Sequence, residues 1–486
     1  MPPESTYVEE PQAKKGIISR SELDARCKAG ELLIVVNQKV YKVDKWIKHH
    51  PGGQLAIRHC IGRDCTDEVR ALHPDYVLEK KFKYFEIADY LPRESDPEFA
   101  PIIGTRTKEE IFEAQEVQIS SAYRQLEARL RAEHLFETNY INYAWEFSRY
   151  LTLFTMAIVL NIYGTCTTHY IASALCLAMF WHQISFFAHD AGHNAITHNL
   201  QIDNGIAIFL ADFMGGLSIG WWKKSHYVHH IVTNHPMHDP DIQHLPVFAI
   251  TTRIFQGLFS SYHQKEIVFD RASQFIVSYQ HYLYYPVMMM GRFNLYLQSM
   301  LFLVSEPNYS YRKQELFGLM IYWTWYPYFL KQLPTWNMVI AYVLISHMFT
   351  FMLHVQITLS HFGMSTEDLG DAESFAAKML RTTMDVECPK WLDWFHGGLQ
   401  FQAIHHLFPR MPRHNLRAAQ PSVKEFCEEV GLKYHIHGFI KGNKIVYSAL
   451  KDVADQVAFF VEVAKHEAKE YVEAQRIVLP ERKKDM

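Results

Sequence analysis

The chain has 486 residues, with 48 lysines and arginines against 52 aspartates and glutamates, for a formal net charge of −4. This balance gives no reason to expect nucleic acid as a partner, and the length supports two or three domains. The seven cysteines form no CxxC pair, which favours reduced thiols in a protein that faces the cytosol. Residues 1–15 are polar and contain three prolines, so we expect no cleavable signal peptide and a cytosolic N-terminus.

Residues 16–92 predict a small soluble α+β domain. Two β-rich runs, 32–36 and 39–43, flank Asn37-Gln38, and helical patterns begin at Trp46. The domain contains His50-Pro-Gly-Gly and, 23 positions later, His73-Pro. With Gly62-Arg-Asp between them, these residues resemble cytochrome b5. The resemblance implies that His50 and His73 are the axial ligands of haem b, which then passes electrons and does not bind oxygen. The alternative is that both are surface histidines.

Residues 93–140 follow as a linker and a surface helix. The segment begins rich in proline and glutamate and then shows a charged helical pattern over 108–134. We expect this pattern to form a solvated helix on the protein or on the membrane surface.

Residues 141–430 predict an all-α integral membrane domain, followed by a cytosolic C-terminal tail at 431–486. Four apolar runs are long enough to cross a bilayer, namely 147–164, 167–187, 315–330 and 337–358. An even number of crossings places both termini on one side. Two other runs, 205–220 and 282–304, are interrupted by polar residues, and we expect them to be interfacial or re-entrant.

Three histidine clusters stand beside these apolar runs. They are His189-Asp-Ala-Gly-His193, His226-Tyr-Val-His229-His230 and Gln402-Ala-Ile-His405-His406. Helical spacing places the histidines of each cluster on one face, and the predicted crossings place all three clusters on the cytosolic side. A chain with 28 histidines could contain one such cluster by chance, but three indicate a metal site. Imidazole ligands without an HExxH or cysteine-pair pattern favour iron over zinc, and so many imidazoles favour two irons.

The last predicted crossing contains three further histidines. His347, His354 and His361 recur every seven residues, so they share one face of a helix. His361 lies at the cytosolic end, and we expect it to be an additional iron ligand. We expect His347 and His354 to hydrogen-bond to neighbouring helices or to a polar part of the substrate.

Iron and O2 can remove hydrogen from an unactivated methylene group, and the N-terminal domain offers the electrons that this needs. With HxxxH, HxxHH and QxxHH boxes behind such a domain, the chain resembles the front-end desaturases, which are membrane di-iron enzymes. The resemblance implies that the iron ligands are His189, His193, His226, His229, His230, His405 and His406. It also implies that Gln402 is a ligand or lies next to one.

Longer stretches are most similar to the fungal sphingolipid Δ8-(E)-desaturases, among them the run from Gly215 to Trp222, the run from His238 to Pro246 and the run from Gly397 to Arg410. This similarity implies a trans double bond between C8 and C9 of the long-chain base of ceramide, with electrons supplied by NADH-cytochrome b5 reductase. A front-end Δ5 or Δ6 fatty-acyl desaturase, a lipid hydroxylase and a membrane-anchored haem electron carrier are the alternatives.

Two smaller features complete the sequence-based expectations. Four aromatic residues either belong to an interfacial belt, which we favour, or line a substrate tunnel: Trp221, Trp222, Tyr284 and Tyr285. Lys483 and Lys484 resemble a dilysine signal of the endoplasmic reticulum, which is the membrane expected for this pathway.

Overall fold

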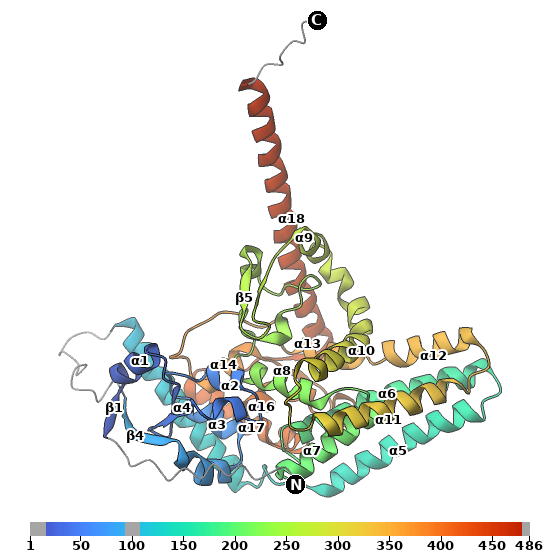
Figure 1. Ribbon diagram of the computed structural model, residues 1–486, viewed down its shortest axis with the longest axis horizontal. Coiled ribbons are helices and arrows are strands. Elements are labelled where there is room, and N and C mark those ends of the chain that lie inside the picture. The colour runs from blue at the N-terminus through green and yellow to red at the C-terminus, as the bar shows by residue number, and fades with distance from the viewer. Residues whose placement is uncertain (1–15, 93–106, 479–486) are drawn as a thin grey trace, which may run out of the picture.

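The computed structural model describes residues 16–92 and 107–478, with side chains as far as residue 473 (Figure 1). The predicted polar tail, most of the predicted linker and the two lysines at 483 and 484 lie outside the described residues.

The N-terminal domain is α+β, as expected, and is built on a four-stranded mixed sheet. Its strand order is β1-β4-β3-β2, with β1 parallel to β4 and the other pairs antiparallel. Asn37 and Gln38 both have positive φ angles, 51° and 58°, which match the twist of the β2–β3 hairpin. The strands are β1 (Ile17–Ser19), β2 (Leu33–Val36), β3 (Lys39–Lys42) and β4 (Glu86–Leu91). The helical segments are α1 (Arg20–Lys28), η1 (Ile47–His49), α2 (Gln54–Arg58), α3 (Thr66–Leu72), η2 (Val77–Lys81) and η3 (Phe82–Tyr84).

A helical bundle forms the apolar part of the second domain. Helix α6 packs against both α5 and α12, and the bundle core contains Trp181, Tyr322 and Tyr342. Figure 1 shows α5, α6, α11 and α12 extending together to one side of the molecule. The helices of this part are α5 (Tyr140–Ile162), α6 (Thr167–Gly192), α10 (Gln280–Ser305), α11 (Arg312–Leu330), α12 (Trp336–Met348) and α13 (Phe351–Leu359).

The helices suited to cross a membrane differ in part from the expected set. Within the described ranges, three segments are long and apolar enough: α6, α10 and the stretch Trp336–Leu359. The expected crossings at 147–164 and 315–330 fall in α5 and α11, which are not among these three segments. The interfacial interpretation of 282–304 is not supported, because α10 runs through as one helix and buries the Arg292 side chain.

The run at 205–220 forms a sharp bend, as a re-entrant segment would. Helix α7 (Leu200–Ile208) continues as η6 (Phe209–Met214) and then turns into α8 (Ile219–Ile231), with a bend of 118°. Gly216 at the bend has a φ of 72°, and a Cβ there would collide with the ring of Tyr322. If this pair counts as one span, the number of candidate spans is four.

The remaining elements cover the ends of these helices. Helix α4 (Lys108–Ala132) matches the predicted helix and buries Tyr123 and Leu126 against α14, α16 and α17. The first turns of α18 pack into the body, and the rest of α18 projects away from it (Figure 1). The helices are α9 (Arg271–Val277), α14 (Phe375–Thr382), α15 (Asp393–His396), α16 (Gln402–Leu407), α17 (Leu416–Val430) and α18 (Phe439–Val478). The strand pairs are β5 (Leu258–Ser260) with β6 (Lys265–Ile267), and β7 (Asp385–Glu387) with β8 (Ile436–Gly438). The short turns are η7 (Pro240–Ile242), η8 (Thr252–Gln256), η9 (Lys390–Leu392), η10 (Leu399–Phe401) and η11 (Arg413–Asn415).

Candidate functional site

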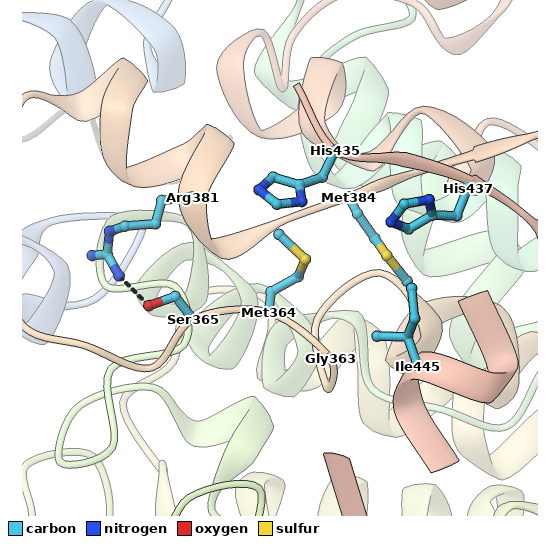
Figure 2. Close-up of a pocket in the computed structure, with 8 residues that line it drawn as sticks. All are labelled: Gly363, Met364, Ser365, Arg381, Met384, His435, His437 and Ile445. Carbon is cyan, nitrogen blue, oxygen red and sulfur yellow. Dashed lines mark hydrogen bonds between the residues drawn. The ribbon is translucent and has the colours of Figure 1, made fainter. Parts of the chain in front are cut away.

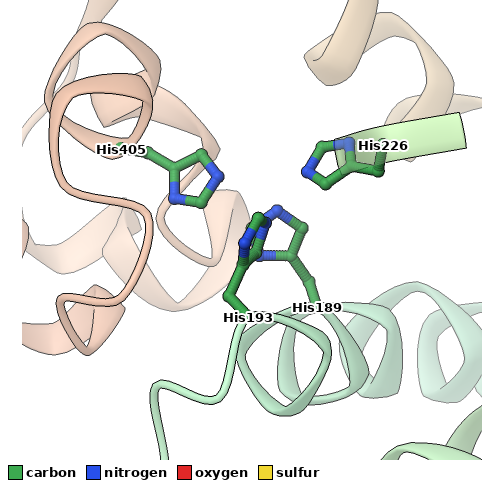
Figure 3. A group of neighbouring side chains, drawn as sticks. All are labelled: His189, His193, His226 and His405. Atoms are coloured by element: carbon green, nitrogen blue, oxygen red, sulfur yellow. The ribbon is translucent and has the colours of Figure 1, made fainter. Parts of the chain in front are cut away.

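Four histidines from three helices converge in what we call the first histidine group. His189 and His193 come from the end of α6, His226 from α8 and His405 from α16. One ring nitrogen of each lies within 4.8 Å of the others, and Figure 3 shows the four rings turned toward one another. Three segments far apart in the sequence thus supply one possible metal site.

Three more histidines make a second histidine group beside the first. His229, His361 and His406 also bring one ring nitrogen each to within 4.8 Å of one another. His230 stands between the groups: its Nε2 lies 3.1 Å from Nε2 of His226 and 3.2 Å from Nε2 of His405, and its ring stacks on His406. Two adjacent groups are the arrangement that a pair of metal ions requires.

The chemistry of these nitrogens fits bound cations. Buried ring nitrogens without a hydrogen-bond partner include those of His193 and His361 and the Nε2 atoms of His189 and His406. Burial lowers the pKa values of His405 and His406 well below the usual range, so both imidazoles are neutral and have a lone pair to donate. An all-imidazole donor set suits iron.

Gln402, the non-histidine of the third cluster, is buried beside these histidines at the start of α16. Its side-chain oxygen has no hydrogen-bond partner within residues 16–92 and 107–478. A buried amide oxygen without a donor is costly, which makes it available to a metal ion or to a water molecule on one. Its role as a ligand stays a prediction.

Sequence reasoning missed the residues that orient the ligands. Asp239 accepts the Nδ1–H of His229 at 2.8 Å, and the Thr233 hydroxyl lies 3.3 Å from Nδ1 of His406, so neither partner contacts Nε2 of these rings. Asn234 donates to the carbonyl of His361 at 2.9 Å, and Asp385 accepts the backbone N–H of Ala403 at the start of α16 at 2.8 Å. The signal for Asp239 was available, because the run His238-Asp-Pro-Asp follows the second cluster by only a few residues.

The histidines at 347 and 354 lie away from both groups. His347 hydrogen-bonds through Nε2 to the hydroxyl of Tyr296 on α10 at 3.2 Å, which confirms the expected contact with a neighbouring helix. The ring of His354 packs against Gly291, also on α10. His347, His354 and His361 were expected on one face of a single helix, but the helix is interrupted between the first two. Helix α12 ends at Met348, and the Thr350 hydroxyl donates to the His347 carbonyl.

The belt interpretation is wrong for two of the four aromatic residues. Trp222 stacks on His226 with ring centroids 4.3 Å apart and also lies edge-on to His189 and His193. Tyr284 is buried and its hydroxyl lies 2.6 Å from that of Thr358. Tyr285 is exposed, and Trp221 packs near Phe302. Trp222 therefore forms part of the wall of the first histidine group.

A small cavity is lined in part by Gly363, Met364 and Ser365, which follow His361 in the chain. It has a volume of about 180 Å³ and is joined to the histidine by the backbone, since Met364 donates to the carbonyl of His361 at 3.0 Å. Figure 2 shows its lining residues: Gly363, Met364, Ser365, Arg381, Met384, His435, His437 and Ile445. Ligand pockets measure roughly 300 Å³ or more, so this cavity is too small for a long lipid chain.

The two histidines of the N-terminal domain face each other. His50 donates its Nδ1–H to the Gly53 carbonyl at 2.9 Å and His73 donates its own to the Val69 carbonyl at 3.0 Å. Both Nε2 atoms then lack a hydrogen, yet they lie only 3.4 Å apart. Burial lowers the pKa of His73 to about 4, so this ring is neutral. Two opposed lone pairs fit a metal ion between them, as axial haem ligation requires.

Fold and site together define a membrane-embedded helical protein in which a histidine-lined metal centre is joined to a bis-histidine electron-carrier domain. The fatty acid desaturase family model matches residues 167–438, and the model of the cytochrome b5-like heme/steroid binding domain matches residues 19–91. The chain belongs to the fatty acid desaturase family and contains a cytochrome b5-like domain at its N-terminus. This membership implies haem in that domain and iron at the histidine groups.

Curated relatives match almost the whole chain. The Delta 8-(E)-sphingolipid desaturase of Emericella nidulans is 42% identical over 93% of this chain and 97% of its own. A protein of the same name from Kluyveromyces lactis is 40% identical over 93% of this chain and 95% of its own. The Acyl-lipid (9-3)-desaturase of Borago officinalis is 34% identical over 92% of this chain and 95% of its own.

Proposed function

We propose that the protein is a sphingolipid Δ8-(E)-desaturase. It introduces a trans double bond between C8 and C9 of the long-chain base of ceramide. The observation that carries this proposal is the near-complete match to relatives named for this reaction, at 42% identity over 93% of the chain. The two histidine groups supply a site suited to the chemistry that the name describes.

The proposal assigns one iron to each histidine group. His189, His193, His226 and His405 would hold one ion, and His229, His361 and His406 the other, with His230 and Gln402 completing the pair. Two irons and O2 supply an oxidant able to remove hydrogen from an unactivated methylene group. The chain's own residues orient the imidazoles: Asp239 fixes His229, and Thr233 supports His406. Trp222 covers the first group on one side.

The N-terminal domain would hold haem b between His50 and His73. Haem with both axial positions filled transfers single electrons. The backbone carbonyls of Gly53 and Val69 hold the two imidazoles in the tautomer that points Nε2 inward. NADH-cytochrome b5 reductase is the partner proposed to reduce this domain.

Domain limits and location follow the same proposal. Residues 16–92 form the haem domain and residues 141–430 the desaturase domain, in the membrane of the endoplasmic reticulum. The haem domain and the C-terminus face the cytosol, where the reductase and NADH are available.

Product analysis tests the proposal. The full chain is expressed in a host whose own long-chain bases are saturated, and the bases are released from ceramide and sequenced by mass spectrometry. The expected product has a trans double bond at C8–C9 and no new double bond in the acyl chains. A double bond found only in fatty acyl chains, at the Δ5 or Δ6 position, would instead establish the acyl-desaturase alternative, and an alcohol would establish a hydroxylase.

A matched pair of variants assigns that product to the histidine groups. His229→Ala removes a member of the second group, whereas His169→Ala removes an exposed histidine in the first turn of α6. We expect the first variant to make no product and to keep its haem spectrum, and the second to behave like the wild type. Full activity in His229→Ala would contradict the metal assignment.

A further inference from the structure

We propose that Tyr227 and Arg410 form the electron-transfer contact between the haem domain and the histidine groups. Tyr227 lies between the His50 loop and His193, and Arg410 joins the His73 backbone to the segment that follows α16. This inference rests on the proposed function, because it assigns the route by which the iron centre is reduced.

Tyr227 touches both sides of the contact. A Cβ built on Gly52 would lie 3.4 Å from Cδ2 of Tyr227 and 3.0 Å from Cε1 of His50, so the tyrosine ring and the histidine ring meet at this glycine. The Tyr227 hydroxyl donates to the carbonyl of Gly192 at 2.7 Å, and the tyrosine ring lies edge-on to that of His193, with centroids 6.0 Å apart. One side chain thus spans the space between a proposed haem ligand and a proposed iron ligand.

Arg410 makes the second connection. Its guanidinium donates to the carbonyl of His73 at 2.8 Å, and it follows His406 by four residues. The Arg410 side chain is buried, and its Nε–H has no acceptor among the described residues. A buried cation beside a haem ligand favours the reduced haem, which has one positive charge fewer than the oxidised haem.

Apolar contacts and ion pairs hold the haem domain against the second domain around these two residues. A single apolar cluster contains Ile34 and Val69 of the haem domain and Val228, Ile231 and Val232 of the α8 segment. Three ion pairs join the haem domain to α4: Asp67 with Arg124 at 2.6 Å, Arg70 with Glu127 at 3.1 Å, and Asp75 with Arg131 at 3.4 Å. Asp67 and Glu127 are almost fully buried. Loss of the arginine partner of either one would therefore destabilise the contact more than loss of an exposed ion pair would.

The electron balance of this step is simple. One electron leaves the ferrous haem, which becomes ferric, and the oxidised iron centre gains it. The haem is then reduced again by the NADH-dependent reductase, or by dithionite in the experiment below. No proton or bond is transferred at Tyr227 or Arg410.

Haem reoxidation in the full-length enzyme tests the inference directly. The protein, loaded with haem and iron and supplied with ceramide in lipid nanodiscs, is reduced with limiting dithionite and mixed with O2 while the haem spectrum is followed by stopped-flow. Tyr227→Phe retains the ring, so it should keep the fast phase of haem reoxidation. Tyr227→Leu should lose this phase while its haem spectrum and iron content stay those of the wild type. A fast phase retained in such a Tyr227→Leu protein would overturn the role of the ring.

Arg410 is tested by the potential of the haem. Arg410→Met should lower the haem midpoint potential and slow the fast phase, whereas Arg129→Met, which removes an exposed arginine paired with Glu425, should change neither. An unchanged midpoint potential and rate in Arg410→Met would refute its part in the contact.

Charge reversal tests the contact without altering either bridging residue. Reversing the three α4 charges creates three repulsive pairs and should abolish the fast phase; the changes are Arg124→Glu, Glu127→Arg and Arg131→Glu. Reversing the three haem-domain partners as well should restore the fast phase; these changes are Asp67→Arg, Arg70→Glu and Asp75→Arg. If the first set leaves the fast phase intact, this docked arrangement does not transfer the electron. A wild type that makes no unsaturated base refutes the proposed function instead, so the two failures are distinguishable.

Discussion

Replacing Asp239 by asparagine should weaken iron binding at the second histidine group. The buried carboxylate accepts three hydrogen bonds: Oδ2 accepts from His229 at 2.8 Å and from the backbone of Asn234 at 2.7 Å, and Oδ1 accepts from the backbone of Asp241 at 2.9 Å. Asparagine has the same shape, but its NH2 group cannot accept. Whichever carboxylate oxygen the NH2 group replaces, Oδ1 or Oδ2, it therefore faces another hydrogen-bond donor. The negative charge beside His229 is also lost.

The magnitude follows from the role of such carboxylates. Removing a group that orients a metal-bound histidine costs about 10- to 100-fold in metal affinity, which is about 1.4 to 2.8 kcal/mol. The assay is the rate at which a chelator removes non-haem iron from the purified protein, with the haem spectrum and the thermal midpoint recorded on the same sample. Asp368→Asn is the matched control, because it makes the same change at an exposed aspartate paired with His235. Equal iron retention in Asp239→Asn and wild type would refute the reasoning.

Four further predictions follow from other parts of the structure. Gly192→Ala would drive a Cβ into Trp222, which stacks on His226, so product should be lost with the haem spectrum intact; Gly205→Ala, where a Cβ meets open space, should keep both. His73→Ala should abolish the haem spectrum without lowering the non-haem iron content, and iron loss in this variant would contradict the separation of the two sites. A chelator that removes the iron should stop product formation without changing the haem spectrum, and readdition of Fe²⁺ should restore it; activity that persists in iron-free protein would count against the metal assignment. Burial raises the pKa of Asp385 to about 7, above its unfolded value of about 4, so the folded state holds this proton more tightly and loses stability as the pH rises between these values. The melting temperature of wild type relative to Asp385→Asn should therefore fall as the pH rises from about 4 to about 7, and a constant difference would contradict this account.

The repeated histidine spacings made much of the site predictable. An i,i+3,i+4 spacing fixes which side chains share a helical face, and an imidazole cluster beside an apolar run has few other uses. His361 could be placed near the other histidines because it follows the apolar run 337–358 by only three residues. The β-rich runs around Asn37-Gln38 and the helical pattern over 108–134 were also local signals; the runs form β2 and β3, and the pattern forms α4, which ends at Ala132.

Features that depend on tertiary contacts could not be predicted in this way. Arg292 made α10 look interfacial, but its charge lies over the Trp181 ring at 3.9 Å and its Nη2 donates to the Gly215 carbonyl at 2.6 Å. Tryptophan is a typical residue of membrane interfaces, and only the fold shows that Trp222 stacks on His226. The contact of Tyr227 with Gly52 joins positions 175 residues apart, which no local spacing reveals.

The ratio of non-haem iron to haem in the purified protein tests the central claim most directly. Two histidine groups beside one bis-histidine haem site predict about two non-haem irons per haem. His193→Ala in the first group and His361→Ala in the second should each lower this ratio without changing the haem content. A ratio of one or less in fully active wild-type protein, or zinc in place of iron, would contradict the assignment of one iron to each group.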